Sequence, residues 1–118
     1  MVEREIDAQL TAILKAAADP TRRSILTLLA QQGPMRVTDL AKQYEMSLNS
    51  VSKHIKTLES AGLVSRRTEW REHLIELKTE RIALIDAWFN DLRSIWEMRL
   101  EKLDTLLTET THDNDERP

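Results

Sequence analysis

The sequence predicts a mainly α-helical domain with one small β-hairpin. Apolar residues recur every three or four positions over most of the chain, which is the spacing of one helix face. The 118 residues include only two Gly and three Pro, so few turns are expected. After Gly62 the helical period stops, and two short segments follow that are typical of strands.

The first two predicted helices lie on either side of an Asp-Pro pair. Residues 5–17 place Ile6, Leu10 and Ile13 on one helical face. Asp19 is suited to the N-cap and Pro20 to the first position of a second helix. That helix is predicted to end at Gly33-Pro34.

The next two predicted helices form a helix-turn-helix over residues 37–61. A short helix covers 37–44, and Glu45-Met46 is the predicted turn. Ser47 is suited to cap the following helix, which we expect to end at Gly62. Two short helices joined by three or four residues are typical of this motif.

A hairpin is predicted over residues 63–77. Its strands are expected at 63–67 and 73–77, around a charged tip at 68–72. The tip contains no Asn-Gly or Asp-Gly, so we expect a loose loop. Trp70 either packs back on the body or stacks against a bound partner, and packing is the favoured interpretation. The order of elements is that of a winged helix-turn-helix with flanking helices.

A long final helix is predicted over residues 79–108. Its apolar stripe is wider than one small domain can cover, so we expect it to pair with a second subunit, accompanied by the helix at 5–17. The predicted dimer interface consists of Ile6, Leu10, Ile13, Ile85, Trp88, Phe89, Leu92, Trp96, Leu100 and Leu103. Its aromatic residues are expected to fill the dimer core; the alternative is an apolar pocket for an unidentified small-molecule effector. Residues 1–109 form one predicted domain, and 110–118 a flexible tail.

Charge is distributed unevenly along the chain, whose formal net charge is −3. Residues 47–71 contain five basic and two acidic residues, a balance of +3, whereas 72–118 contain 12 acidic and six basic residues, a balance of −6. A basic middle segment suits contact with nucleic acid. The chain has no Cys and no apolar run near the roughly 20 residues of a membrane span, so we expect a cytoplasmic protein without membrane attachment.

Catalytic and metal-binding motifs are not evident in the sequence. It has no Gly-rich phosphate loop, no HExxH and no Cys nucleophile, so we expect no enzyme activity and no cofactor. The three histidines fall on the predicted fourth helix, the hairpin and the tail, which is not a metal-ligand spacing, so no metal site is expected.

The helix at 48–61 has two distinct faces. Val51, Ile55 and Leu58 lie within about 60° on a helical wheel and are predicted to anchor the helix to the core. Asn49, Lys53 and Lys56 lie on the opposite face, and their side chains suit base edges and phosphates in a major groove. The predicted partner is therefore double-stranded DNA. The predicted contacts are Ser47, Asn49, Ser50, Ser52, Lys53, His54, Lys56, Arg66, Arg67 and Arg71.

Three segments resemble the ArsR/SmtB family in the right order. They are Ala18 to Leu29 for the second helix, Val37 to Ala41 for the third, and Ser47 to Val64 for the recognition helix. The resemblance implies a homodimeric winged-helix repressor of a pseudo-palindromic operator. The alternative is a winged-helix module that binds protein rather than DNA.

The chain departs from that family at the metal-sensing positions. Where arsenic-sensing members carry Cys-x-Cys, this sequence has Arg36 and Thr38. Where zinc-type members carry Asp-x-His, it has Asp86-Ala87-Trp88, and its last predicted helix contains no His. The resemblance therefore implies a member that lacks the usual metal ligands.

Overall fold

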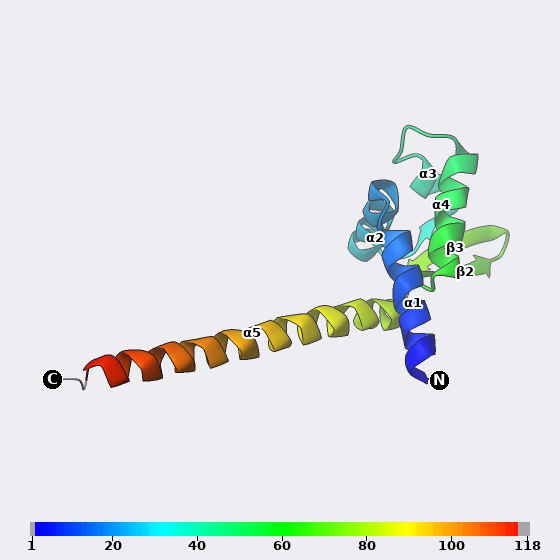
Figure 1. Cartoon of the computed structure of the whole chain (residues 1–118). Coiled ribbons are helices and arrows are strands. Elements are labelled where there is room, and N and C mark those ends of the chain that lie inside the picture. The colour runs from blue at the N-terminus through cyan, green and yellow to red at the C-terminus, as the bar shows by residue number, and fades with distance from the viewer. Residues whose placement is uncertain (1, 116–118) are drawn as a thin grey trace. The chain divides into compact units, whose positions relative to one another are not determined.

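The computed structural model describes the backbone of residues 2–115 and the side chains of residues 3–109. Five helices and three short strands make up this part of the chain, and they divide into two compact units between Ile85 and Asp86. In chain order they are α1 (Val2–Ala17), α2 (Pro20–Gln32), β1 (Met35–Arg36), α3 (Val37–Ala41), α4 (Leu48–Ser60), β2 (Val64–Glu69), β3 (Glu72–Leu77) and α5 (Thr79–Asp115) (Figure 1).

The predicted boundaries of α2 are confirmed. The Asp19 side chain accepts a hydrogen bond from the Arg22 backbone N–H at 3.0 Å, which satisfies one of the amides that a helix leaves free at its start. At the other end, Gly33 has φ 78° and ψ −163° and donates its N–H to the Leu29 carbonyl. That conformation is nearly restricted to glycine, which explains why the helix ends there.

The helix-turn-helix forms as predicted, but α3 is shorter than the expected 37–44. It ends at Ala41, and residues 42–47 form the turn before α4. Leaving the helix early lets Tyr44 pack against the core, and its hydroxyl lies 3.0 Å from the Ser24 Oγ of α2. This contact between distant residues is invisible to helical periodicity.

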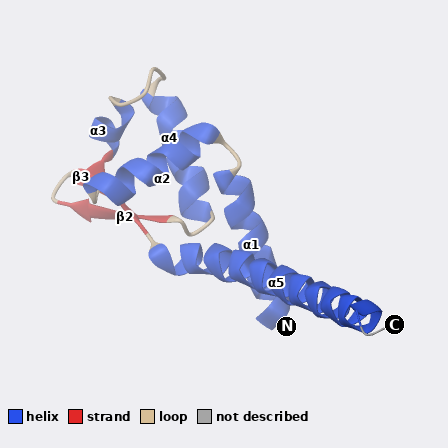
Figure 2. Cartoon of the chain, turned by 90° about the vertical axis from the view of Figure 1, so that its left-hand side faces the viewer, coloured by secondary structure: helices blue, strands red, loops and turns tan. Residues whose placement is uncertain are grey.

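The wing is part of a three-stranded antiparallel sheet with order β1-β3-β2 (Figure 2). Strand β1 was not predicted, because two residues are too few to show a period. The expectation of a loose tip is wrong: Glu69 pairs with Glu72, so Trp70 and Arg71 alone make the turn. Trp70 has φ 62°, the backbone conformation that a tight turn needs.

One apolar core holds the first unit together. It contains the inward faces of α1, α2, α3 and α4 together with the start of β2 and the middle of β3. The fully buried or nearly buried side chains are Ile13, Ala16, Ile25, Leu29, Leu40, Val51, Ile55, Leu58, Ala61, Leu63, Val64 and Ile75. No polar side chain is buried among the described residues, so apolar packing is the main contact that holds α4 to the body.

Helix α5 begins in the first unit and continues as the second. Ile82 and Ile85 pack against the core of the first unit. The helix continues to Asp115, beyond the predicted end at 108, because no Gly or Pro interrupts residues 79–117. Residues 116–118 of the predicted tail lie outside the described residues. No helix between residues 2 and 115 has the length and apolar character needed to span a bilayer.

Candidate nucleic-acid interface

Helix α4 is held to the body on one side and capped at its start. Val51, Ile55 and Leu58 are fully buried, as the wheel predicted. Ser47 occupies the N-cap: its Oγ accepts a hydrogen bond from the Ser50 N–H at 3.1 Å and donates one to the Ser50 Oγ at 3.0 Å. Both serines therefore order the first turn of the helix.

The opposite face of α4 is open. Asn49, Lys53 and Lys56 are exposed and Ser52 is half-buried, so these four predicted contacts share one accessible side of the helix. None of the four side chains makes a hydrogen bond or ion pair with the described residues. An amide, two ammonium groups and a hydroxyl on one helical face can bind base edges and phosphates without first breaking an internal bond.

His54 behaves differently from the rest of the predicted set. Its side chain is 22% exposed, and its Nδ1 lies 3.3 Å from Arg22 Nη1 and 3.9 Å from Asp19 Oδ2. The imidazole is therefore engaged with the start of α2 rather than displayed beside Lys53. Sequence reasoning missed this contact, which joins residues 32 positions apart.

Arg22 links three helices. Its Nε donates to the Ala16 carbonyl at 2.6 Å and its Nη2 to the Lys15 carbonyl at 3.2 Å, both at the end of α1, while its Nη1 contacts His54. A cation here also complements the negative end of the α1 dipole. The Arg22 backbone N–H bonded to Asp19 lowers the pKa of that carboxyl, and the charges of His54 and Arg22 lower it further.

A hollow lies between α4 and strand β2. It is lined by Ser52, Lys56, Glu59, Ser60 and Arg66 and has a volume of about 570 Å³. Arg66 crosses it to Glu59, with Nη2–Oε1 at 2.9 Å and Nε–Oε1 at 3.2 Å. Two cations and one carboxylate leave a net charge of +1, which suits a phosphate group.

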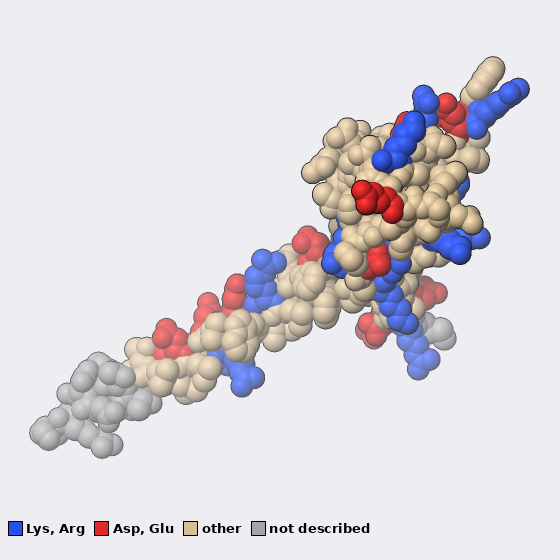
Figure 3. All heavy atoms as spheres, turned by 90° about the horizontal axis from the view of Figure 1, so that it is seen from above, with Lys and Arg blue, Asp and Glu red and all other residues tan. Residues whose placement is uncertain are grey.

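The three predicted wing arginines are not equivalent. Arg66 pairs with Glu59, and Arg67 lies 3.4 Å from Glu69 and 3.6 Å from Glu76. Among the described residues, Arg71 forms no hydrogen bond or ion pair. Figure 3 shows that basic and acidic side chains are interspersed over the visible face of the first unit.

Trp70 corrects a prediction. The favoured interpretation was that it packs on the body, yet it is 84% exposed at the tip of the wing. The two-residue turn explains the difference, because it leaves the side chain no core surface within reach.

The predicted dimer stripe is largely open in the single chain. Trp88, Phe89, Leu92, Trp96, Leu100 and Leu103 are exposed along α5. The rings of Trp88 and Phe89 contact each other, with centroids 5.1 Å apart. In α1, Ile6 is exposed and Leu10 half-buried, and Ile85 is half-buried at the start of α5.

Ile13 is a correction to this set. It is fully buried in the core of its own chain and has no surface left for a partner. Periodicity identified the apolar face of α1 but could not separate its buried end from its exposed end.

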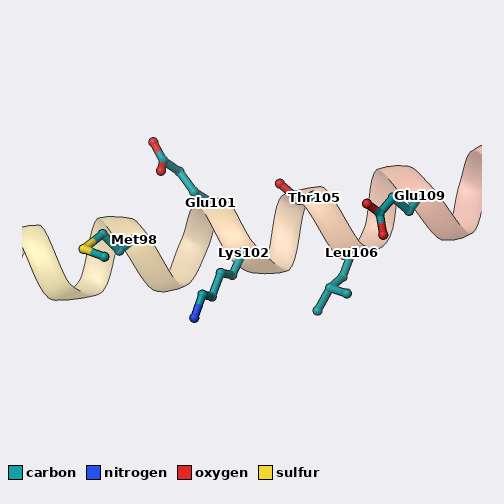
Figure 4. Close-up of a pocket in the computed structure, with 6 residues that line it drawn as sticks. All are labelled: Met98, Glu101, Lys102, Thr105, Leu106 and Glu109. Atoms are coloured by element: carbon teal, nitrogen blue, oxygen red, sulfur yellow. The ribbon is translucent and has the colours of Figure 1, made fainter.

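Small-molecule and metal sites are poorly supported in the described residues. The hollow in Figure 4 is lined by Met98, Glu101, Lys102, Thr105, Leu106 and Glu109, all from α5, so one helix forms its wall. In residues 3–109, no three His, Asp or Glu side chains come together to hold a metal ion.

Comparison with known proteins gives a consistent result. A family model described as a helix-turn-helix domain matches residues 17–67. The arsenical resistance operon repressor of Staphylococcus xylosus is 33% identical over 78 residues, which are 66% of this chain and 74% of that protein.

Solved structures extend the similarity to the fold. The crystal structure of an ArsR family transcriptional regulator is 36% identical, with a TM-score of 0.72 over 77% of this chain and 93% of that one. A homodimeric winged helix-turn-helix DNA-binding domain from Mycobacterium bovis, solved in solution, is 29% identical. Its TM-score is 0.63, over 78% of this chain and 84% of that one.

Proposed function

Because this chain belongs to the ArsR family of DNA-binding transcriptional regulators, we propose that it is a repressor that binds a pseudo-palindromic operator as a homodimer. The observation that carries the proposal is the exposed polar face of α4, backed by a fully buried apolar face and flanked by the basic hollow. That arrangement lets α4 enter a major groove while β2 stays beside the phosphate backbone.

Each side chain of the interface has a role in the proposal. Asn49 would read a base through its amide, which can pair bidentately with adenine. Lys53, Lys56 and Arg66 would supply phosphate contacts. Arg67 would contribute less, because Glu69 and Glu76 already pair with its guanidinium. Ser47 and Ser50 shape the first turn of α4, whose free N–H groups favour a phosphate nearby.

Dimerisation would place two copies of α4 on one side of a duplex. The exposed stripe on α5, together with Ile6 and Leu10 of α1, is the proposed contact between subunits. The homodimeric state of the similar domain from Mycobacterium bovis supports it. Two recognition helices would then meet major grooves about 34 Å apart, and repression would follow from covering a promoter.

Selection of bound sequences from random DNA, at stated salt, tests this function. We expect an enriched motif with two inverted half-sites and a mobility shift that weakens as salt rises. Lys56→Ala should weaken binding to all duplexes similarly, whereas Asn49→Ala should weaken operator binding more than random binding. Absence of any salt-sensitive shift would favour a protein-binding module instead.

Release of the operator would need a ligand that favours a non-binding dimer, with a coupling of about 1–3 kcal/mol. The group of Trp88, Phe89 and Trp96 is predicted to fill the dimer core, and an apolar ligand pocket there is the alternative interpretation. A saturable change in Trp emission during titration with apolar compounds would support this site. No change with any of them would assign these side chains to dimer packing alone.

A further inference from the structure

We propose that Leu48, the first residue of α4, reads a thymine in each half-site by packing against the thymine methyl group. This inference rests on the proposed function and deepens it, because it adds an apolar base contact to the polar contact of Asn49. Leu48 belongs neither to the exposed polar face of α4 nor to the basic hollow beside β2.

Leu48 is an apolar side chain that the fold leaves open to solvent. It is 51% exposed, and it is not among the apolar residues that pack against the core of the first unit. Within residues 3–85 only four large apolar side chains are exposed: Ile6, Met46, Leu48 and Trp70. Two of these four flank Ser47, the N-cap of α4, so exposed apolar surface gathers at the start of this helix.

The needs of folding explain Met46 better than Leu48. An apolar residue before the N-cap commonly packs against the fourth helical residue, and in α4 these two positions are Met46 and the buried Val51. The first helical position has no such partner, and it favours Pro or an acidic side chain that complements the helix dipole. An exposed Leu48 therefore adds little to the stability of its own subunit.

The position of Leu48 along α4 places it over the base pairs. Leu48, Ser52 and Lys56 follow one another at intervals of four residues along one edge of the helix, and the last two line the hollow beside β2. At about 1.5 Å per residue, Leu48 lies about 12 Å along the axis from Lys56. The major groove is about 12 Å wide and about 8.5 Å deep, so a helix whose third turn contacts the backbone presents its first turn to the base edges.

The chemistry of the major groove identifies the contact. Guanine, adenine and cytosine present hydrogen-bonding groups there, whereas thymine also presents its C5 methyl group. The Leu48 side chain has no hydrogen-bonding atom, so it gains from contact with this methyl group, which removes apolar surface on both sides from water. Asn49 is suited to adenine, so the first turn of α4 predicts a half-site in which adenine and thymine lie close together.

Replacing thymine by uracil tests the contact directly, because uracil lacks only the C5 methyl group. Each thymine of the selected operator is replaced in turn by deoxyuridine, at symmetric positions in both half-sites, and affinity is measured by fluorescence anisotropy at fixed salt. For wild type we expect a position where the change lowers affinity about fourfold per half-site, which corresponds to about 0.8 kcal/mol for one buried methyl group.

Leu48→Ala and Met46→Ala provide the matched comparison. Leu48→Ala should bind the thymine and uracil duplexes equally at that position, because its side chain is too short to reach the methyl group. Met46→Ala removes the other exposed apolar side chain beside the same N-cap and should keep the difference, as should Leu48→Met, which remains apolar. Leu48→Ala should unfold at the same temperature as wild type and keep its salt dependence, because it removes neither a buried side chain nor a phosphate contact.

Three results would overturn the inference and leave the proposed function intact. The selected half-site could contain no enriched thymine, the thymine–uracil difference could persist in Leu48→Ala, or it could disappear in Met46→Ala instead. Absence of any salt-sensitive mobility shift with wild type would overturn the proposed function itself, and the inference with it.

Discussion

Replacing Glu59 by Gln tests whether the hollow between α4 and β2 receives a DNA phosphate. In wild type this hollow contains Lys56, Arg66 and Glu59, a net charge of +1, and the amide would raise it to +2. The Arg66 Nη2 lies 2.9 Å from the Glu59 carboxylate, so an incoming phosphate must share that guanidinium. We therefore expect Glu59→Gln to bind DNA more tightly.

The size of the effect follows from the charge that is removed. A phosphate about 6 Å from the carboxylate is repelled by about 0.7 kcal/mol at the dielectric constant of water, and by about 3 kcal/mol at a value of 20. The hollow is open to solvent and salt, so we take about 1 kcal/mol per subunit. That is about fivefold in affinity for one subunit and about thirtyfold for a dimer. Loss of the partly exposed ion pair should cost the fold at most about 1 kcal/mol.

Fluorescence anisotropy with operator and random duplexes, from about 50 to 200 mM salt, measures this change. Both duplexes should gain affinity, because a phosphate contact carries little sequence information. Lys56→Ala is the matched opposite: it lowers the net charge of the hollow to zero and should make the salt dependence less steep by about 0.9 per subunit. Weaker binding by Glu59→Gln would refute the reasoning and make Glu59 a residue that orients Arg66 for DNA.

Three further predictions concern stability, measured by chemical or thermal unfolding. The lowered pKa of Asp19 means that its contribution to the free energy of unfolding is present above about pH 4 and is lost as the pH falls through the folded-state pKa. Asp19→Asn, which can still cap the helix, should therefore make the loss of stability at acid pH less steep. An unchanged loss of stability at acid pH would contradict the assignment. Ile55→Ala, at a fully buried position, should cost about 2–5 kcal/mol, and a loss under 1 kcal/mol would mean that α4 repacks. Gly33→Ala should cost about 1–3 kcal/mol through backbone strain alone, since no atom lies within 4 Å of the added Cβ; a neutral result would show that the backbone relaxes.

Local signals were enough to predict the helices that form the helix-turn-helix. Asp19-Pro20 marks the start of α2, and Ser47 the start of α4, because capping depends on residues within one turn. The burial of Val51 and Ile55 followed from a strong helical period. These features set the accessible face of α4, so most of the candidate interface could be predicted.

Contacts between distant residues could not be predicted in this way. The two-residue strand β1 exists because β3 pairs with it. The register of β2 with β3 imposes a two-residue turn at Trp70, although the backbone conformation of that turn favours glycine. The engagement of His54 by α2 and the burial of Ile13 depend on how helices cross. These features arise from tertiary packing, which the spacing of apolar residues along the sequence cannot reveal.

The guanidinium of Arg22 has a consequence for the geometry of the dimer. It joins the last carbonyls of α1 to the imidazole of His54 in α4, and Asp19 at the start of α2 lies within the same network. A rotation of α1 therefore cannot occur without changing these bonds or carrying α4 with it. If α1 is held against a second subunit, the separation of the two DNA-reading faces depends on the tilt of α1, and the spacing of half-sites on the operator reports that tilt.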